Sequence, residues 1–264
     1  MGGERGLAFH LQGVSLRYGA QTALEDVTLD IAPGEAVGLV GPSGAGKTSL
    51  LRLLGAALPP TDGLLAIAGQ DLATVSPRAL RQLRASLGFI HQDLRLVPNL
   101  RVSQNVLAGR LGRLGFLGSL RHLLLPPRRE LASVHALLER VGIEDKLFAR
   151  SDRLSGGQLQ RVAIARALHQ QPLAMLADEP VASVDPARAR DTVELLTRIC
   201  AEEGLTLVMS LHNLALAREH FPRLVGLRAG RLAFDAPVDQ VTEAQFAALY
   251  TLDAPAPPGS AHGG

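Results

Sequence analysis

The sequence has no tryptophan, two tyrosines and one cysteine, and aromatic residues make up only 3% of its 264 positions. So few aromatic rings leave little surface on which the bases of a single-stranded nucleic acid could stack. The one cysteine, Cys200, agrees with a cytoplasmic protein. It stands at helical spacing from Val193, Leu196 and Ile199, which predicts a buried thiol rather than a reactive one.

Lysine is also scarce, since only Lys47 and Lys146 are present and the remaining basic residues are arginines. The formal net charge is +2, which is too small to indicate the concentrated basic face of a DNA-binding protein. We therefore expect no nucleic-acid partner. One of the two lysines falls in a glycine-rich segment that is described below.

Long apolar runs are missing as well. No uncharged apolar stretch reaches the roughly 18 residues that a membrane-spanning helix needs. The first seven residues show no apolar core of a signal peptide, so we expect a cytoplasmic chain. With 47% hydrophobic and 20% charged residues, the composition is that of a globular protein. The length allows a sizeable core in one compact domain, with or without a subdomain.

The first third of the chain predicts strands and then a strand, loop and helix in succession. Apolar residues alternate over residues 9–16 and 27–31, and the apolar segment 36–40 is typical of a buried parallel strand. After Lys47 an apolar pattern of helical spacing continues without a breaker until Pro59-Pro60. This order is the one that a phosphate-binding loop requires.

The rest of the chain predicts an α/β core with helices inserted into it. Residues 92–170 have a helical pattern with a break at Pro126-Pro127, and we interpret them as a helical subdomain. Strands at 173–177, 206–210, 224–227 and 232–234 alternate with helices after Pro186 and over 214–219, which favours a mainly parallel sheet. Asp185 and the pair Thr242 and Gln245 are typical of helix N-termini.

These patterns predict a single domain over residues 1–252, with a core formed by 1–91 and 171–252 and the helical subdomain at 92–170. The fold class is α/β, with an antiparallel β portion near the N-terminus. Residues 253–264 are rich in Pro, Ala, Gly, Ser and His and are predicted to be a disordered tail.

One segment, which we call the phosphate loop, predicts a nucleotide site between the strand at 36–40 and the helix that follows. It consists of Gly41, Pro42, Ser43, Gly44, Ala45, Gly46, Lys47 and Thr48. Its glycines let successive backbone N–H groups converge on phosphate oxygens, and the helix adds its positive N-terminal end. Lys47 would neutralise β- and γ-phosphate charge, and the Thr48 hydroxyl would bind Mg²⁺.

Two carboxylates, Asp178 and Glu179, end the apolar strand at 173–177. In a parallel sheet the carboxyl ends of the strands form the ligand edge. Asp178 could hold Mg²⁺ directly or through water, while Glu179 could orient and deprotonate the water that attacks the γ-phosphate. Acidic residues end many strands, so this interpretation depends on the phosphate loop that precedes it in the chain.

A second anion-binding pattern occurs at residues 154–158, where Leu154 is followed by Ser155, Gly156, Gly157 and Gln158 at the start of a helix. A single nucleotide hardly needs two anion-binding segments from the same chain. The pattern therefore suggests that this one serves the γ-phosphate of a nucleotide held by another protomer. A simple helix-capping turn is the alternative for the segment taken alone.

The order of these elements resembles the ABC transporter ATPase family over roughly residues 9–250. The matching elements are the phosphate loop, Gln92, residues 154–158, Asp178-Glu179, Ser183-Val184-Asp185 and His212. By that resemblance Tyr18 would stack on adenine and Gln92 would meet Mg²⁺ and the attacking water. Asp185 matches a loop that couples two sites, and His212 matches a residue that contacts the γ-phosphate.

The resemblance also implies ATP and Mg²⁺ as cofactors and a head-to-tail homodimer with ATP at its interface. The implied partners are two integral membrane permease subunits and, indirectly, an extracytoplasmic substrate-binding protein. The chain would lie peripherally on the cytoplasmic face of the inner membrane.

Within the family, residues 106–112, 118–120, 178–183, 210–212, 217–219 and 225–231 are similar to the phosphonate importer ATPase subfamily. Leu159, His91 and Ala236 depart from its usual pattern, which leaves phosphite or phosphate open as cargo. Lipoprotein export and a soluble, non-transport ABC ATPase are further alternatives, although the chain has no fused permease-type helices, second cassette or heptads. A small-molecule kinase would have no use for residues 154–158.

Overall fold

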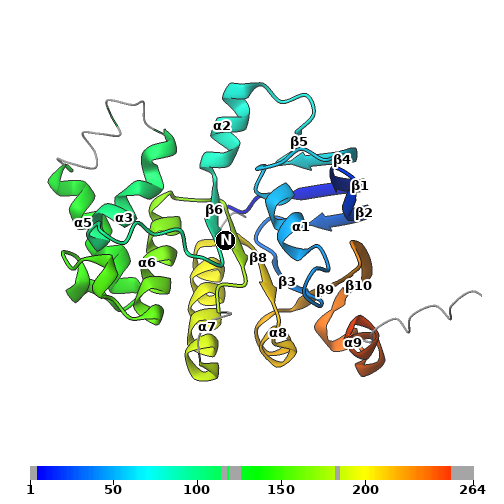
Figure 1. Ribbon diagram of the computed structural model, residues 1–264. Helices are drawn as coiled ribbons and strands as arrows, with labels where there is room; N and C mark the ends of the chain where they lie inside the picture. Colours follow the sequence, from blue (N-terminus) through cyan, green and yellow to red (C-terminus); the bar gives the residue numbers. More distant parts are fainter. Residues whose placement is uncertain (1–4, 114–117, 119–125, 182–184, 251–264) are drawn as a thin grey trace, which may run out of the picture.

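The computed structural model describes residues 5–113, 118, 126–181 and 185–250. Two β-sheets and the helices around them make up this part of the chain (Figure 1). The predicted tail at 253–264 lies outside the described residues, as do residues 182–184.

The smaller sheet is antiparallel, as predicted, and has the strand order β2-β1-β4-β5. Its strands are β1 (Phe9–Tyr18), β2 (Gln21–Ile31), β4 (Asp62–Ile67) and β5 (Gln70–Asp71). Strands β4 and β5 were not anticipated from the sequence. The apolar side chains of β1 and β2 face a core that they share with α1 (Lys47–Leu54), which lies between the two sheets (Figure 1).

The larger sheet has the order β10-β9-β3-β8-β7-β6. Its strands are β3 (Ala36–Val40), β6 (Leu87–Ile90), β7 (Ala174–Asp178), β8 (Thr206–Leu211), β9 (Arg223–Arg228) and β10 (Arg231–Pro237). All neighbours from β9 to β6 pair in parallel, and only β10 runs antiparallel. The prediction of a mainly parallel sheet is therefore confirmed, and the carboxyl ends of five strands meet at one edge.

Helices α3 (Val102–Leu107), α5 (Arg128–Arg140) and α6 (Gly156–His169) fall within the segment predicted to be helical, and they pack on one another. They lie on the far side of the larger sheet from the antiparallel sheet (Figure 1). Helices α7 (Pro186–Glu203), α8 (Leu214–His220) and α9 (Glu243–Tyr250) complete the core, and α2 (Pro77–Ala85) precedes β6. Short 3-10 turns connect them at Ala108–Arg113, Glu144–Lys146, Ser151–Arg153 and Val238–Gln240.

Several local predictions are confirmed. The Asp185 side chain caps α7 by accepting from the Arg188 N–H, with proline at the first helical position. Thr242 and Gln245 form the capping box of α9. Cys200 is buried, and burial raises the pKa of its thiol to about 12. Helix α1 ends earlier than predicted, at Leu54 before Gly55 rather than at the proline pair.

Among the described residues, no helix is both long enough and apolar enough to cross a bilayer.

Candidate nucleotide-binding site

The parallel strands bring several separate predictions to one edge of the sheet. The phosphate loop leaves the end of β3, the acidic pair ends β7, and His212 follows β8. Strand β6, the neighbour of β7, leads directly to Gln92. Because these strands run the same way, side chains more than 100 residues apart in sequence meet there.

Glycine is required at two positions of the phosphate loop. Gly41 and Gly46 have φ angles of 150° and 106°, which favour glycine. A Cβ at Gly41 would lie 2.2 Å from the Leu227 carbonyl oxygen, and one at Gly46 would lie 2.8 Å from that of Ala23. The loop therefore packs closely against the backbone of other segments. The N-terminus of α1 has no side-chain cap, so its backbone N–H groups are available to a ligand.

Lys47 is almost fully buried at the start of α1. Its ammonium donates to the carbonyl oxygens of Gly41 at 2.8 Å and Pro42 at 3.1 Å. It also lies 3.5 Å from a carboxylate oxygen of Glu179. Burial lowers the pKa of Lys47, and the negative charge of Glu179 opposes that shift. A cation in this position suits an anionic ligand held by the loop.

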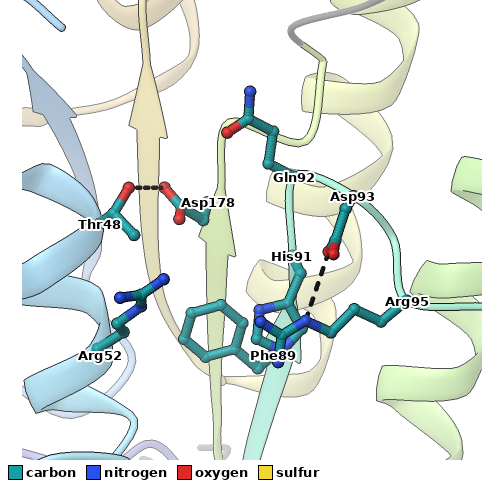
Figure 2. Close-up of a pocket in the computed structure, with 8 residues that line it drawn as sticks. All are labelled: Thr48, Arg52, Phe89, His91, Gln92, Asp93, Arg95 and Asp178. Carbon is teal, nitrogen blue, oxygen red and sulfur yellow. Dashed lines mark hydrogen bonds and ion pairs between the residues drawn. The ribbon is translucent and has the colours of Figure 1, made fainter.

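Asp178 is a buried carboxylate whose oxygen Oδ1 accepts two hydroxyl hydrogen bonds. Thr48 donates to it at 3.1 Å and Ser210 at 3.0 Å (Figure 2 shows the Thr48 contact). Ser210 also accepts from the backbone N–H of Glu179 at 2.9 Å. Sequence reasoning assigned no role to Ser210. Its position became informative only once β7 and β8 were neighbours, with Asp178 opposite Ser210.

Glu179 contacts His212 as well as Lys47. Its oxygen Oε2 lies 2.6 Å from Nε2 of His212, and only 12% of its side chain is exposed. The backbone of Glu179 has a φ of 45°, which is uncommon for a residue with a side chain and costs free energy of order 1–3 kcal/mol. Such strain is found at functional sites where surrounding contacts fix the backbone.

Two further predicted residues line clefts at this edge. Gln92 lines a cleft of about 460 Å³ together with Thr48 and Asp178 (Figure 2). Tyr18, at the end of β1, is 41% exposed and lines a neighbouring cleft of about 330 Å³ with the phosphate loop and Glu179. Each of them lines a cleft together with residues of the phosphate loop, and their predicted roles stay predictions.

The residues at this edge fit a magnesium ion bound together with a nucleotide. A hydroxyl and a carboxylate, from Thr48 and Asp178, point to the same place. Mg²⁺ typically takes one or two carboxylates and completes its shell with water and substrate phosphates. In the described part of the chain, no cluster of three or more His, Cys, Asp or Glu could hold a metal alone. Phosphate oxygens would have to complete such a site.

The segment at 155–158 lies elsewhere. Ser155 caps α6 and forms a capping box with Gln158, so the helix-capping alternative describes its local structure correctly. A separate cleft is lined by Ser155, Gly157 and Gln158 together with Arg188 and Thr192, and a Cβ at Gly156 would meet open space. Within one chain the structure does not bring this segment to the phosphate loop. Asp185 lines neither cleft.

Known proteins resemble this chain over most of its length. It matches the ABC transporter family profile over residues 24–182. The phosphonates import ATP-binding protein PhnC of Pseudomonas putida is 48% identical over 95% of this chain and 93% of its own. A protein of the same name from Anaeromyxobacter dehalogenans is 51% identical over 93% of this chain, which spans about half of that relative's length (48%).

Among solved structures, the dimeric bacterial ABC transporter cassette MJ0796 superposes with a TM-score of 0.76. It is 29% identical, and the match covers 87% of this chain and 98% of that one. Another structure of the same cassette is a dimer bound to ADP and phosphate, in a post-hydrolysis state. On the strength of its sequence and its fold, this chain belongs to the ABC transporter family, as a protein that carries the ATP-binding cassette.

Proposed function

We propose that this chain is the ATP-hydrolysing subunit of an ABC importer for a phosphonate-like oxyanion. The observation that carries the proposal is the meeting of Lys47, Asp178 and Glu179 at one sheet edge, beside an uncapped helix N-terminus. Cation, metal ligand and general base lie together there. A relative that is 48% identical over nearly the whole chain is named as a phosphonate import ATP-binding protein.

The residues divide the chemistry among them. Backbone N–H groups of the loop and the Lys47 ammonium hold the phosphates and offset their charge. Mg²⁺, held by Thr48 and Asp178, would supply further neutralisation of phosphate oxygens. The Glu179 carboxylate accepts the proton of the attacking water. His212, in contact with Glu179, orients it and reaches the γ-phosphate, while Gln92 borders the same cleft.

The active unit is a head-to-tail homodimer. Ser155 and the N-terminus of α6 form a second anion-binding device that is exposed and lies in a cleft away from the phosphate loop. Two copies in opposite orientation would bring the α6 N-terminus of one to the nucleotide of the other. The dimeric state of the MJ0796 cassette supports this arrangement. Asp185, which caps α7, would couple the two sites.

Transport requires other chains. The dimer would dock from the cytoplasmic face onto two permease subunits, which receive cargo from an extracytoplasmic binding protein. Cargo is recognised by those partners, so phosphite and phosphate are tested beside phosphonate. The cargo is tested by expressing this chain in a bacterial strain that lacks its own ATPase subunit but keeps the permease and the binding protein, and by measuring growth. Growth on phosphonate as sole phosphorus source supports the proposal. Growth on phosphate or phosphite but not on phosphonate would show that one of these is the cargo instead.

Titration calorimetry with Mg-ATP tests the nucleotide site. We expect Lys47→Ala to lose most of the affinity because it removes the buried cation of the loop. Lys146→Ala is the matched control, since Lys146 is the other lysine and pairs at the surface with Asp145. Equal affinities for the two variants would show that the loop is not the nucleotide site.

A further inference from the structure

Gln160 of α6 forms a hydrogen bond to the residue that follows Glu179. Its Nε2 atom donates to the carbonyl oxygen of Pro180 at 2.8 Å, and both residues are buried. Proline has no backbone N–H, so this carbonyl is the only hydrogen-bonding group of Pro180. A buried carbonyl without a partner costs free energy, and Gln160 supplies the partner from a different element.

The side-chain amide of Gln160 has one defined orientation. Only its NH2 end can donate to a carbonyl, so Nε2 faces Pro180. The other end, Oε1, lies 3.5 Å from the hydroxyl of Thr192 on α7. Only 6% of Gln160 is exposed, and Thr192 is equally buried. The amide therefore lies between α7 and the segment after β7, with its donor directed at that segment.

The backbone of Glu179 depends on contacts of this kind. Its φ of 45° lies in the left-handed region, although the residue before a proline prefers an extended backbone. Ser210 fixes the backbone on one side by accepting from the Glu179 N–H at 2.9 Å. Gln160 fixes it on the other side, at the carbonyl of the next residue. The conformation that places the carboxylate beside Lys47 and His212 is thus held between β8 and α6.

Gln160 also lies close to the end of α6 that would serve a partner chain. It follows Gly156, the first residue of the helix, by one helical turn. Among the described residues that line the three clefts at the sheet edge and at the start of α6, Gln160 is absent. It can therefore affect the chemistry only through the residues to which it is bonded.

We propose that Gln160 is a positioning residue for Glu179 of its own chain. Its amide fixes the Pro180 carbonyl, and with it the left-handed backbone that directs the Glu179 carboxylate at the attacking water. The first turn of α6 would then act on two nucleotides, through its N-terminus on that of the partner and through Gln160 on its own. The proposal rests on the proposed function, because it assumes that Glu179 is the general base.

Steady-state ATPase kinetics of Gln160→Met test the role. Methionine keeps the length and the helix propensity of the side chain but cannot donate. We expect kcat to fall about threefold to tenfold, as the loss of one ordinary hydrogen bond implies. KM for Mg-ATP should change much less, because the phosphate loop holds the nucleotide. Gln160→Asn, whose amide ends one methylene short of Pro180, should lower kcat in the same way and decides the question if Gln160→Met does not fold.

Gln170→Met is the matched control. Gln170 ends the same helix, and its Nε2 atom also donates to backbone carbonyls, those of Arg84 and Leu87, both at 3.0 Å. Leu87 begins β6, at the end of the strand away from the site. We expect both variants to lower the melting temperature and only Gln160→Met to lower kcat. If Gln160→Met kept the wild-type kcat, or if Gln170→Met lowered it equally, the positioning role would be refuted.

Mixed dimers show in which chain Gln160 acts, which a merely structural role would not. Ser155→Arg and Lys47→Ala chains together form one composite site, from the loop and Glu179 of the first chain and the α6 N-terminus of the second. We expect phosphate release to fall when Gln160→Met is added to the Ser155→Arg chain. Added to the Lys47→Ala chain, it should leave the rate of the mixture unchanged.

The reverse result, or an equal fall in both mixtures, would overturn the inference and leave the composite site intact. If wild type hydrolysed no ATP, the proposed function and this inference would both fail. If only the Ser155→Arg and Lys47→Ala mixture were inactive, the head-to-tail dimer would be refuted, and kcat of Gln160→Met would still decide the role of Gln160.

Discussion

The Nε2 atom of His212 lies 2.6 Å from Oε2 of Glu179, although the two residues follow different strands of the sheet. The other carboxylate oxygen of Glu179 lies 3.5 Å from the Lys47 ammonium. The carboxylate therefore bridges a histidine and a lysine of the same site. Each of the two contacts can be removed by a separate substitution, so their roles in binding and turnover can be measured independently.

Glu179→Gln is expected to bind ATP and to hydrolyse it at least about 100-fold more slowly, because the amide keeps the shape of the carboxylate but cannot accept the proton. Loss of the negative charge also relieves repulsion against the γ-phosphate, so the ATP-bound dimer should accumulate. Phosphate release and light scattering with Mg-ATP measure the two effects. His212→Ala should slow hydrolysis without the gain in dimer.

Glu194→Gln is the control for this prediction, since Glu194 is exposed on α7. If Glu179→Gln stayed monomeric and hydrolysed ATP at the wild-type rate, Glu179 would not be the general base.

Ser155→Arg should abolish ATP hydrolysis and leave the binding of one nucleotide per chain nearly intact. The added side chain fills the exposed start of α6, which is remote from the phosphate loop of the same chain. Mixing this variant with Lys47→Ala should restore one composite site per mixed dimer, from one intact loop and one intact α6 N-terminus. Phosphate release from the mixture measures it. Wild-type activity of Ser155→Arg alone would rule out composite sites.

Ser210→Ala should weaken both the fold and the response to Mg²⁺. The buried hydroxyl donates to Asp178 and accepts from the Glu179 N–H, so its loss costs on the order of 1–3 kcal/mol of unfolding free energy. Without that donor Asp178 is less well oriented, and half-maximal ATPase activity should require more Mg²⁺. Denaturant unfolding and magnesium titration measure the two effects.

Ser103→Ala is the comparison for Ser210→Ala, because Ser103 is a buried serine on α3 outside the site. A magnesium requirement that both variants left unchanged would contradict a role of Ser210 at Asp178.

His91 should make the protein less stable in acid. Burial and the positive charge of Arg95 lower the pKa of His91 to about 4, from an ordinary value of 6.5. Arg166 and Arg52 act in the same direction, and Asp93 opposes them. Below pH 6.5 His91 becomes protonated in the unfolded chain, whereas in the folded chain it stays neutral until the pH nears 4. The free energy of unfolding therefore falls as the pH falls through this range.

His91→Gln should flatten this part of the curve of melting temperature against pH, since glutamine does not titrate. His135→Gln is the control, because His135 is exposed on α5. A curve for His91→Gln that follows wild type between pH 6.5 and 4 would contradict the prediction.

Local sequence signals predicted the parts of the site that depend on nearby residues. The phosphate loop could be recognised because its glycines, its lysine and the following helix are contiguous, and Asp185 because a cap acts within one turn. Strand β6 was not predicted because it has only four residues. Two of them, Leu87 and Ile90, are buried hydrophobic residues. In so short a segment the spacing of hydrophobic residues does not distinguish a strand from a helix.

The role of Ser210 depends on which elements become neighbours, and no local pattern encodes that. Ser210 is opposite Asp178 only because β8 pairs with β7 in one register. Such contacts are a property of topology, and the sequence of either segment alone does not reveal them.

The left-handed backbone of Glu179 has a consequence for the order in which the site forms. The Ser210 hydroxyl accepts the Glu179 N–H, and this bond exists only when β8 has docked beside β7. Until then an extended or right-handed backbone is less strained for this residue. The left-handed backbone of Glu179 is therefore stabilised by this hydrogen bond only in a chain in which β8 already lies beside β7.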